Sequence, residues 1–474
     1  MRDLREFLQK LEENKELLQI NDAHWELEIG AITELVAKRD GPALLFDKIE
    51  GYPPGYRVAS NLLNDKKRCA IALGMPPDTT NLEIIRRFRQ SSSTELIRPI
   101  EVKTGPAMDN VFQGKDVNLL KFPTPRWHDL DGGRYIGTFH LVIMKDSDTG
   151  WVNAGVERVM LQDENTLSLY ISPGKDNDVI REKYYSKGEK CPVVIAFSPD
   201  PILFMSGALA LPWGTSELDW AGMIKQKPVE IIQGEITGIP FPANAEIVIE
   251  GECLLPGVET RPEGPFGEFT GYYARAETLT PVVHVKALYH RENPILAGCP
   301  PMKPPLVEVR PPVFTAPAIW DNLERAGVHG VQGVWQHEAG SGQCIVIVSI
   351  KQYHSGHSKK AALVAASGYL KKLVIVVDED IDPTDIDEVL WAVAMRCDPL
   401  AQTDIIQNCW GTPLDPRLSP EQRDRGDYTH STLIIDACKP FHWRDKFPAI
   451  NEISPELKRQ TIKKWGKKIN ILEQ

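Results

Sequence analysis

The stretch between about residues 115 and 310 carries a succession of short apolar runs typical of strands. The runs at 140–144, 166–172, 192–198, 229–236, 245–255 and 281–290 are rich in valine, isoleucine and aromatic residues and have turn-type flanks. This is the longest part of the chain with a single sequence pattern, and it also contains the unusual polar clusters. It predicts a mostly β domain as the main body of the protein.

A change of texture follows a proline-rich stretch at 299–313, which fits a domain edge because proline cannot join a central ladder. Beyond it, helical and strand-like patterns alternate, which predicts a small α/β domain with a largely parallel sheet. The apolar run at 372–380 ends in acidic residues and is typical of a buried central strand.

Each end of the chain has a helical pattern. Residues 2–18 place leucine and phenylalanine near one face, which predicts an amphipathic helix. The last segment begins with serine, proline and glutamate, a helix start, and ends basic. Such a terminal helix either docks on another subunit or stays solvated. The expected units are 1–310, 311–450 and 451–474.

Composition excludes several classes of protein. With 54 basic and 65 acidic residues, the net charge of −11 does not suit a general nucleic-acid binder. No apolar run approaches the roughly 20 residues of a membrane helix, and the N-terminus has no apolar signal core. We therefore expect a cytoplasmic protein without integral membrane association. The eight cysteines are scattered without CxxC spacing, which signals neither a zinc knuckle nor a redox pair.

The most specific local signal is the turn Glu-Gly-Pro-Phe-Gly-Glu at 263–268. Glu263 and Glu268 stand five residues apart around two glycines and a proline, which suits a rigid turn. Two close carboxylates cannot both ionise cheaply, so one of them tends to become a proton donor near neutral pH. A surface turn with solvated acids is the competing interpretation.

Two further clusters carry polar groups that could serve chemistry. Alternation along a strand at 151–160 puts Asn153 and Glu157 on one face and Arg158 on the other, unless a bulge intervenes. A structural salt bridge would also explain Arg158. Glu217 and Asp219 offer oxygen ligands for a hard cation, or they are simply acids in the first turn of a helix.

Several familiar sites are not signalled. The sequence has no P-loop, no HExxH and no GxSxG elbow. His354 and His357 have ligand-like spacing but stand at an expected helix start. The acids at 378–382 follow an expected strand, where solvated side chains are common.

Taken in order, these clusters resemble the UbiD family of reversible decarboxylases. The order is Asn153 with Arg158, then Glu217, then the turn at 263–268, then VVDEDIDP and VLWAVAMRCDP at 376–399. The resemblance runs over essentially the whole chain. The combination of the turn with the acidic strand end is far more specific than either part alone.

The resemblance implies an α/β (α+β) fold, with a large split-β-barrel cofactor domain, a smaller α/β oligomerisation domain and a C-terminal helix that reaches a neighbouring subunit. It implies prenylated flavin mononucleotide, made by a partner flavin prenyltransferase and held with Mn²⁺ or Mg²⁺ and with K⁺. It further implies decarboxylation, in some members carboxylation, of an aromatic, heteroaromatic or α,β-unsaturated acid. Homodimers and homohexamers are usual in the family.

Roles follow by motif from the same resemblance. Asn153 and Glu217 match metal ligands, Arg158 matches the arginine beside the reactive flavin ring, Glu268 matches the proton donor and Glu263 matches the acid paired with the arginine. In addition, Thr138 matches a strand that lines the cofactor, and Lys175 lies by position at the cofactor and substrate pocket.

This chain departs from the family pattern in two places. Asp176 stands where many relatives have a histidine metal ligand, and Asp can ligate Mn²⁺ or Mg²⁺. With a shifted loop, Asp178 or no residue at all would bind the metal instead. Many relatives also have a lysine near the phosphate where this chain reads Ser431-Thr432.

Two other functions remain open at this stage. The departures would suit a non-catalytic UbiD-like subunit of a multi-subunit carboxylase, although the retained acids argue against it. A metal-assisted hydrolase that uses the carboxylate pair is the second, and it would need no flavin.

Overall fold

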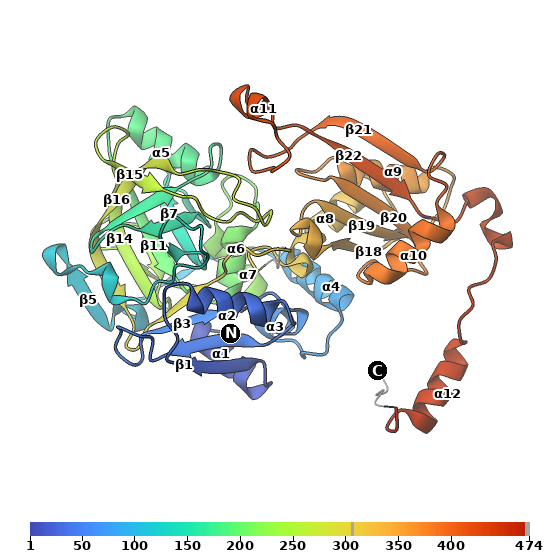
Figure 1. Ribbon diagram of the computed structural model, residues 1–474, viewed down its shortest axis with the longest axis horizontal. Helices are drawn as coiled ribbons and strands as arrows, with labels where there is room; N and C mark the ends of the chain where they lie inside the picture. The colour runs from blue at the N-terminus through green and yellow to red at the C-terminus, as the bar shows by residue number, and fades with distance from the viewer. Residues whose placement is uncertain (305–307, 470–474) are drawn as a thin grey trace.

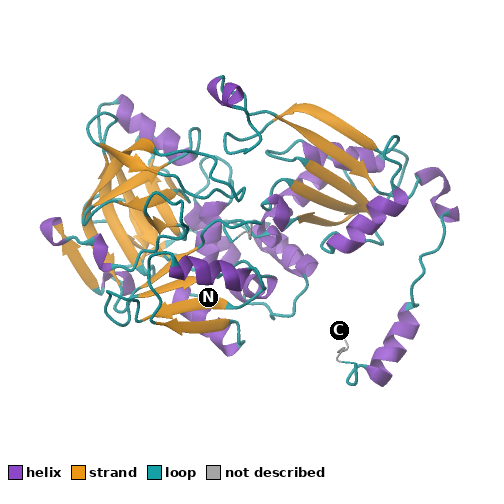
Figure 2. Ribbon diagram, viewed as in Figure 1, coloured by secondary structure: helices purple, strands orange, loops and turns teal. Residues whose placement is uncertain are grey.

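The computed structural model describes residues 1–304 and 308–469. Figure 1 shows a β-rich body that contains the N-terminus, an α/β body beside it, and a C-terminal helix that extends away from both. Coloured by element type, the strands gather in these two bodies, and helices lie between them (Figure 2).

A ten-stranded sheet forms the centre of the first body and curls into a split barrel, as expected. Its main order is β6-β9-β10-β16-β14-β11-β7-β8, and β5 and β15 also pair with β16. Because β16 is 13 residues long, it pairs with four different strands along its length. The strands are β5 (Asn110–Gln113), β6 (Arg134–Gly137), β7 (His140–Lys145), β8 (Val152–Gly155), β9 (Arg158–Leu161), β10 (Thr166–Tyr170), β11 (Cys191–Phe197), β14 (Ile247–Cys253), β15 (Thr260–Glu263) and β16 (Thr278–His290).

Two smaller sheets and seven helices surround the barrel. One sheet has the order β1-β2-β3-β17 and the other β13-β12-β4. Their strands are β1 (Leu17–Asn21), β2 (Ala43–Asp47), β3 (Arg57–Ser60), β17 (Ile295–Gly298), β4 (Ile100–Glu101), β12 (Glu230–Gln233) and β13 (Pro240–Pro242). The helices are α1 (Leu4–Glu13), α2 (Glu28–Ala37), α3 (Lys66–Ala72), α4 (Asn81–Ser92), α5 (Asp176–Ser186), α6 (Pro201–Ala208) and α7 (Glu217–Lys225). Short 3-10 helices lie at Pro106–Met108, Gly114–Asp116 and Leu119–Lys121.

The N-terminal helix is shorter than the sequence pattern predicts. It ends at Glu13, and Lys15 takes a φ of 61°, which turns the chain into β1. Leu18 therefore belongs to a strand and is 46% exposed, whereas Leu4, Phe7 and Leu11 of the helix are fully buried. The apolar spacing correctly predicted the helix, but Leu18, which fits the same spacing, lies in the following strand.

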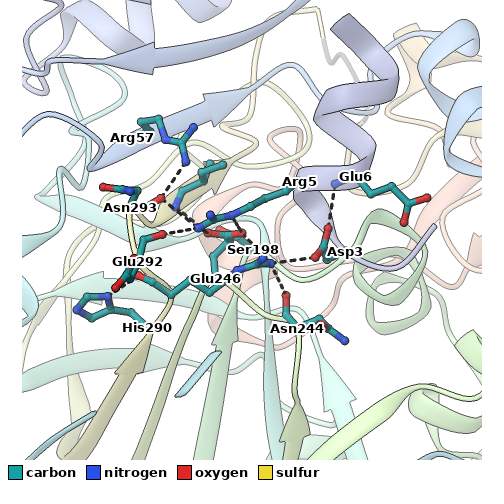
Figure 3. A network of polar contacts seen from close by, with 12 residues as sticks. Asp3, Arg5, Glu6, Arg57, Ser198, Asn244, Glu246, His290, Glu292 and Asn293 are labelled. Carbon is teal, nitrogen blue, oxygen red and sulfur yellow. Dashed lines mark hydrogen bonds and ion pairs between the residues drawn. The ribbon is translucent and has the colours of Figure 1, made fainter. Parts of the chain in front are cut away.

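A buried polar network ties α1 to the barrel (Figure 3). Both oxygens of Glu246 accept hydrogen bonds of 2.8 Å from Arg5, and the same carboxylate lies 3.3 Å from Arg291. Arg291 also pairs at 3.0 Å with Asp3, whose carboxylate caps α1 by accepting from the backbone of Glu6. The first residues of the chain are thus fixed to the strand ends by charged pairs.

We expect Glu246→Ala to lower the free energy of unfolding by about 3–5 kcal/mol, because it removes the buried carboxylate that pairs with Arg5 and is one of the two that pair with the largely buried Arg291. Urea titration measures the loss. Glu13→Ala is the matched control, since it removes only exposed contacts with Lys10 and Gln9 on the same helix. Equal losses in the two variants would contradict a stabilising role for the buried network.

The second body is an α/β domain with a five-stranded sheet of order β18-β19-β20-β22-β21. The three central strands run parallel, but β18 and β21 at the edges are antiparallel to their neighbours, so the expectation of a largely parallel sheet holds only for the centre. The elements are α8 (Pro312–Arg325), β18 (Val331–Gln336), a 3-10 helix at Glu338–Gly340, β19 (Ile345–Ile350), α9 (His357–Ala366), β20 (Leu373–Asp378), α10 (Ile386–Arg396), β21 (Thr403–Cys409), α11 (Pro420–Asp424) and β22 (His430–Asp436).

Aromatic packing joins the two bodies. Phe88 of α4 lies 5.1 Å from Phe314 of α8 and 5.5 Å from Trp220 of α7, measured between ring centroids. One apolar core therefore continues from the N-terminal helices into the α/β domain.

The C-terminal helix α12 (Pro455–Trp465) follows a 3-10 segment at Phe441–Lys446 and has no buried residue. It lies apart from both bodies in Figure 1. Within the described residues, no helix has the length and apolar character needed to cross a bilayer.

Candidate active site

The structure brings Arg158, Glu263 and Glu268 together in one buried cluster. Arg158 begins β9 and Glu263 ends β15, so two strand ends and the following turn meet at this point. The Nη2 atom of Arg158 donates to Glu263 at 2.7 Å, and its Nη1 atom donates to Glu268 at 2.9 Å. One guanidinium thus holds two carboxylates on its fork.

The turn that carries the glutamates is held rigidly from one side. The backbone N–H of Gly132 donates to the carbonyl of Pro265 at 2.8 Å, and a Cβ at Gly132 would stand 1.8 Å from the carbonyl oxygen of Gly264. Gly264 itself takes a φ of 91°, which only glycine adopts without strain. The ring of Phe266 lies 3.9 Å from that of Tyr135. The glycines therefore permit a contact that fixes both acids.

The two glutamates have different surroundings. Glu263 is fully buried and accepts a second hydrogen bond, of 3.0 Å, from the hydroxyl of Tyr135. Burial raises the pKa of Tyr135, so this hydroxyl keeps its proton and donates. Among the residues that the structure describes, the Glu268 side chain has only Arg158 as a partner. Burial raises the pKa of Glu268; Arg158 opposes this rise, and the charge of Glu263 adds to it. Glu268 is the member of the pair suited to carry a proton.

A second cluster contains a buried amide and a buried carboxylate on neighbouring elements. Asn153 on β8 is buried, and its Oδ1 atom has no partner among the described residues, while its Nδ2 atom donates to Asn177 at 2.8 Å. Glu217 begins α7 and accepts from the backbone N–H of Ala154 at 2.8 Å. Burial raises the pKa of Glu217 to about 8. An amide oxygen and a costly buried carboxylate at one point are suited to a hard cation.

Asp176, and not Asp178, is the acid whose charge acts on Glu217 in this cluster. Asp178 is engaged in its own loop, where it accepts from the backbone of Gly174 at 2.9 Å and pairs with Arg181 at 2.8 Å. Asp176 begins α5, and its charge contributes to the raised pKa of Glu217. Burial also raises the pKa of Asp176. In the described part of the chain no group of three or more His, Cys, Asp or Glu could hold a metal, so any cation here needs the amide of Asn153.

The position of Thr138 and the strand expected at 151–160 differ from the sequence prediction. Thr138 is not in a strand but between β6 and β7, where its hydroxyl accepts from the backbone of Cys299 at 3.1 Å. The expected single strand at 151–160 is two strands, β8 and β9, separated at 156–157. Lys175 precedes α5, and its amine pairs with Glu157 at 3.2 Å.

Sequence reasoning missed a pair of buried cations. The Nη1 atom of Arg310 donates to the side chain of Gln343 at 3.1 Å, and Lys371 donates to the Gln343 backbone at 3.1 Å. Neither makes an ion pair with a described residue. Burial lowers the pKa of Lys371 to about 8. Burial also lowers the pKa of Arg310, and Tyr369 and Glu157 partly offset that change. No motif marks them, because only the fold brings the linker and the α/β domain together.

Another missed feature is the ring of Tyr170 on β10. The guanidinium carbon of Arg158 lies 4.7 Å from its centroid, and that of Arg275 lies 4.2 Å from it. Arg275 comes from the segment just after the turn with the glutamates. A second arginine thus stands beside the acid pair.

The remaining sequence candidates have structural roles. His357 begins α9 and stacks 4.6 Å from His354. Asp380 pairs with Arg396 at 2.8 Å and Lys439 at 2.6 Å. Neither set collects free ligand atoms at one point.

Comparison with known protein families matches most of the chain. Residues 8–88, 98–304 and 313–437 match, in turn, the N-terminal, Rift-related and C-terminal domains described for 3-octaprenyl-4-hydroxybenzoate carboxy-lyase, UbiD. The three matches follow one another along the chain, and the second and third meet at the linker between its two bodies.

Individual proteins are similar over nearly their whole length. A pyrrole-2-carboxylic acid decarboxylase of Pseudomonas aeruginosa is 31% identical, over 98% of this chain and 97% of that protein. The open form of vanillic acid decarboxylase of Sedimentibacter hydroxybenzoicus, with truncated ShVdcD, has a TM-score of 0.86 at 26% identity, covering 98% and 99% of the two chains. An evolved dimeric form of the UbiD-class enzyme HmfF from Pelotomaculum thermopropionicum, in complex with prFMN, has a TM-score of 0.81 at 26% identity, covering 97% and 98%. The chain belongs to the UbiD family of carboxy-lyases.

Proposed function

We propose that this protein is a reversible, non-oxidative decarboxylase of an aromatic, heteroaromatic or α,β-unsaturated carboxylic acid that works with prenylated flavin mononucleotide. The observation that carries the proposal is one arginine, Arg158, held between the buried carboxyl of Glu263, which Tyr135 also contacts, and a second acid, Glu268, suited to carry a proton. The decarboxylases among its relatives support the reaction class, and the prFMN complex of a UbiD-class enzyme supports the cofactor.

The residues present fit the cofactor and its metal. Loss of carbon dioxide leaves an electron pair, and the flavin would supply the sink that side chains lack. Asn153, Asp176 and Glu217 offer three oxygen ligands for Mn²⁺ or Mg²⁺, and the unpartnered Oδ1 of Asn153 supports this assignment. We further expect K⁺ near the phosphate.

Other residues would hold the ends of the cofactor. The partly buried Arg310 and the buried Lys371 have no acidic partner among the described residues, which suits a phosphate. Many relatives have a phosphate-binding lysine where this chain has Ser431-Thr432, and Lys371 would take its place. Thr432 lies beside Lys371, because its hydroxyl donates to the Lys371 carbonyl at 2.5 Å. Thr138 and Lys175 would line the cofactor on the barrel side.

In the proposed reaction Glu268 donates its proton to the carbon that has lost carbon dioxide, and regains one before the next turnover. Arg158 holds Glu268 in position and remains charge-balanced by Glu263, which the Tyr135 hydroxyl fixes. In the carboxylation direction Glu268 accepts the proton instead. The chain's own contribution is orientation, charge placement and one proton.

The test is co-expression with a flavin prenyltransferase, followed by purification without oxygen. We expect a coloured protein that releases prenylated flavin on denaturation, identified by mass, and that releases carbon dioxide from aromatic acids. A colourless protein, even after addition of Mn²⁺ and K⁺, would favour the non-catalytic subunit. Hydrolysis by flavin-free protein would favour the metal-assisted hydrolase.

We also propose that the protein self-associates as a dimer or hexamer through its α/β domain and C-terminal helix. Apolar side chains are exposed on α10, β21 and α12, among them Met395, Ile405 and Leu457. A surface of this kind is typical of an interface between copies. An evolved relative is dimeric, which supports the proposal.

Removal of residues 451–474 should therefore reduce the number of subunits per particle in solution. The helix α12 has no buried residue within its own chain and would bind a second copy. Light scattering coupled to size-exclusion chromatography measures this. The full-length chain is the control, and an unchanged number of subunits in the truncated protein would contradict the role of α12.

A further inference from the structure

Arg275 stands unpaired beside the acid cluster. Its guanidinium carbon lies 4.2 Å from the centroid of the Tyr170 ring, and the residue is partly buried. Within residues 1–304 and 308–469 it makes no ion pair and no hydrogen bond through its side chain. Burial lowers the pKa of Arg275, and the charge of Arg158 lowers it further.

The contrast with Arg158 is informative. Both arginines stack on Tyr170, but Arg158 is neutralised by Glu263 and Glu268, whereas Arg275 has no counter-charge. Two neighbouring cations of which one lacks an anion are an unfavourable arrangement unless a ligand supplies the anion. The guanidinium is planar and offers paired donors, the geometry that fits a carboxylate or an oxygen of a ring substituent.

The position of Arg275 is fixed from both sides. The hydroxyl of Tyr273 donates to the buried carboxylate of Asp131 at 3.0 Å. Arg423, from α11 of the α/β domain, donates to the carbonyl oxygen of Ala274 at 3.1 Å. The segment that carries Arg275 is therefore anchored to both bodies of the protein, as a residue that selects a ligand requires.

We infer that Arg275 binds a second oxygen substituent of the substrate, a carboxylate or a phenolic oxygen that does not react. The inference rests on the proposed decarboxylase function and deepens it. A guanidinium that paired the reacting carboxylate would stabilise the ground state and oppose the loss of carbon dioxide. A non-reacting oxyanion carries no such penalty, because its pairing persists unchanged through the reaction.

The test compares the flavin-loaded wild type with Arg275→Gln on terephthalate, para-hydroxybenzoate and benzoate. We expect kcat/KM for the preferred doubly substituted acid to fall by about ten- to a hundredfold in the variant, and kcat/KM for benzoate to change by less than about twofold. Arg275→Lys should retain part of the preference, because it keeps the charge but not the paired donors. Arg261→Gln is the matched control, since Arg261 lies on the nearby strand β15 and pairs with Asp163 and Glu259.

A second measurement separates this inference from the proposed function. Calorimetry with terephthalate and para-hydroxybenzoate measures binding whether or not either acid is turned over. Weaker binding to Arg275→Gln than to wild type supports the inference even if no acid is decarboxylated, an outcome that would count against the proposed function alone. Equal binding by the two proteins, absence of binding to wild type, or an equal loss of kcat/KM for benzoate would overturn it.

Discussion

Replacement of Glu268 by Gln is expected to lower kcat for decarboxylation by about 10²–10⁴-fold and to leave the flavin bound. The amide keeps the size of the carboxyl and can still accept from Arg158, but it cannot supply a proton. Single-turnover release of carbon dioxide and the content of released flavin are measured on the same sample. Turnover like that of the wild type would remove Glu268 from the role of proton donor.

The pH dependence gives an independent check on the same residue. Burial raises the pKa of Glu268, so its protonated form persists to higher pH than that of an ordinary glutamate. Because the donor must be protonated, activity should fall as pH rises through this raised pKa, and this alkaline limb should be absent from the residual activity of Glu268→Gln. Glu259→Gln is a suitable control, since its partly exposed carboxylate lies just before β15 and pairs with Arg261 and His284.

The sequence predicted the architecture where local patterns decide it. The β-rich block became the barrel, and the alternation beyond the proline-rich stretch became the α/β domain that begins with α8 at Pro312. The direction of edge strand β21 could not be predicted, because an antiparallel edge has the same side-chain alternation as a parallel one. The end of α1 depended on the left-handed conformation of Lys15, which the apolar spacing does not reveal.

For the site, motif order pointed to residues that the fold brings together, but not to their neighbours. Arg158, Glu263 and Glu268 come from three places in the sequence and meet on one guanidinium. Tyr135 and Arg275 carry no motif, and their contacts exist only because β6 and the segment after the turn pack beside β9 and β10. Long-range contacts of this kind cannot be read from spacing along the chain.

Replacement of Glu217 by Gln is expected to weaken Mn²⁺ binding by more than about 100-fold and to lose the flavin with it. The carboxylate is buried beside Ala154 and lies near the charge of Asp176, so a cation is what balances it in the loaded protein. Removal even of a supporting residue behind a metal ligand costs about 10–100-fold in affinity, and a direct ligand should cost more. Metal content and flavin content after dialysis measure both losses.

In the metal-free protein, Glu217→Gln is expected to increase the free energy of unfolding. The pKa of Glu217 is raised to about 8 in the folded chain, above its ordinary value of 4.5, so its contribution to stability is full below that ordinary value and is lost as pH rises through about 8. Glu217→Gln should therefore make the metal-free protein more stable than wild type at pH 8 and flatten the dependence of stability on pH, as thermal unfolding at several pH values would show.

Asp219→Asn, in the same first turn of α7, is the matched control for both measurements. If it lost metal and flavin as Glu217→Gln does, a general distortion of the helix start would explain the losses. If Glu217→Gln kept both, the cation would have to bind elsewhere.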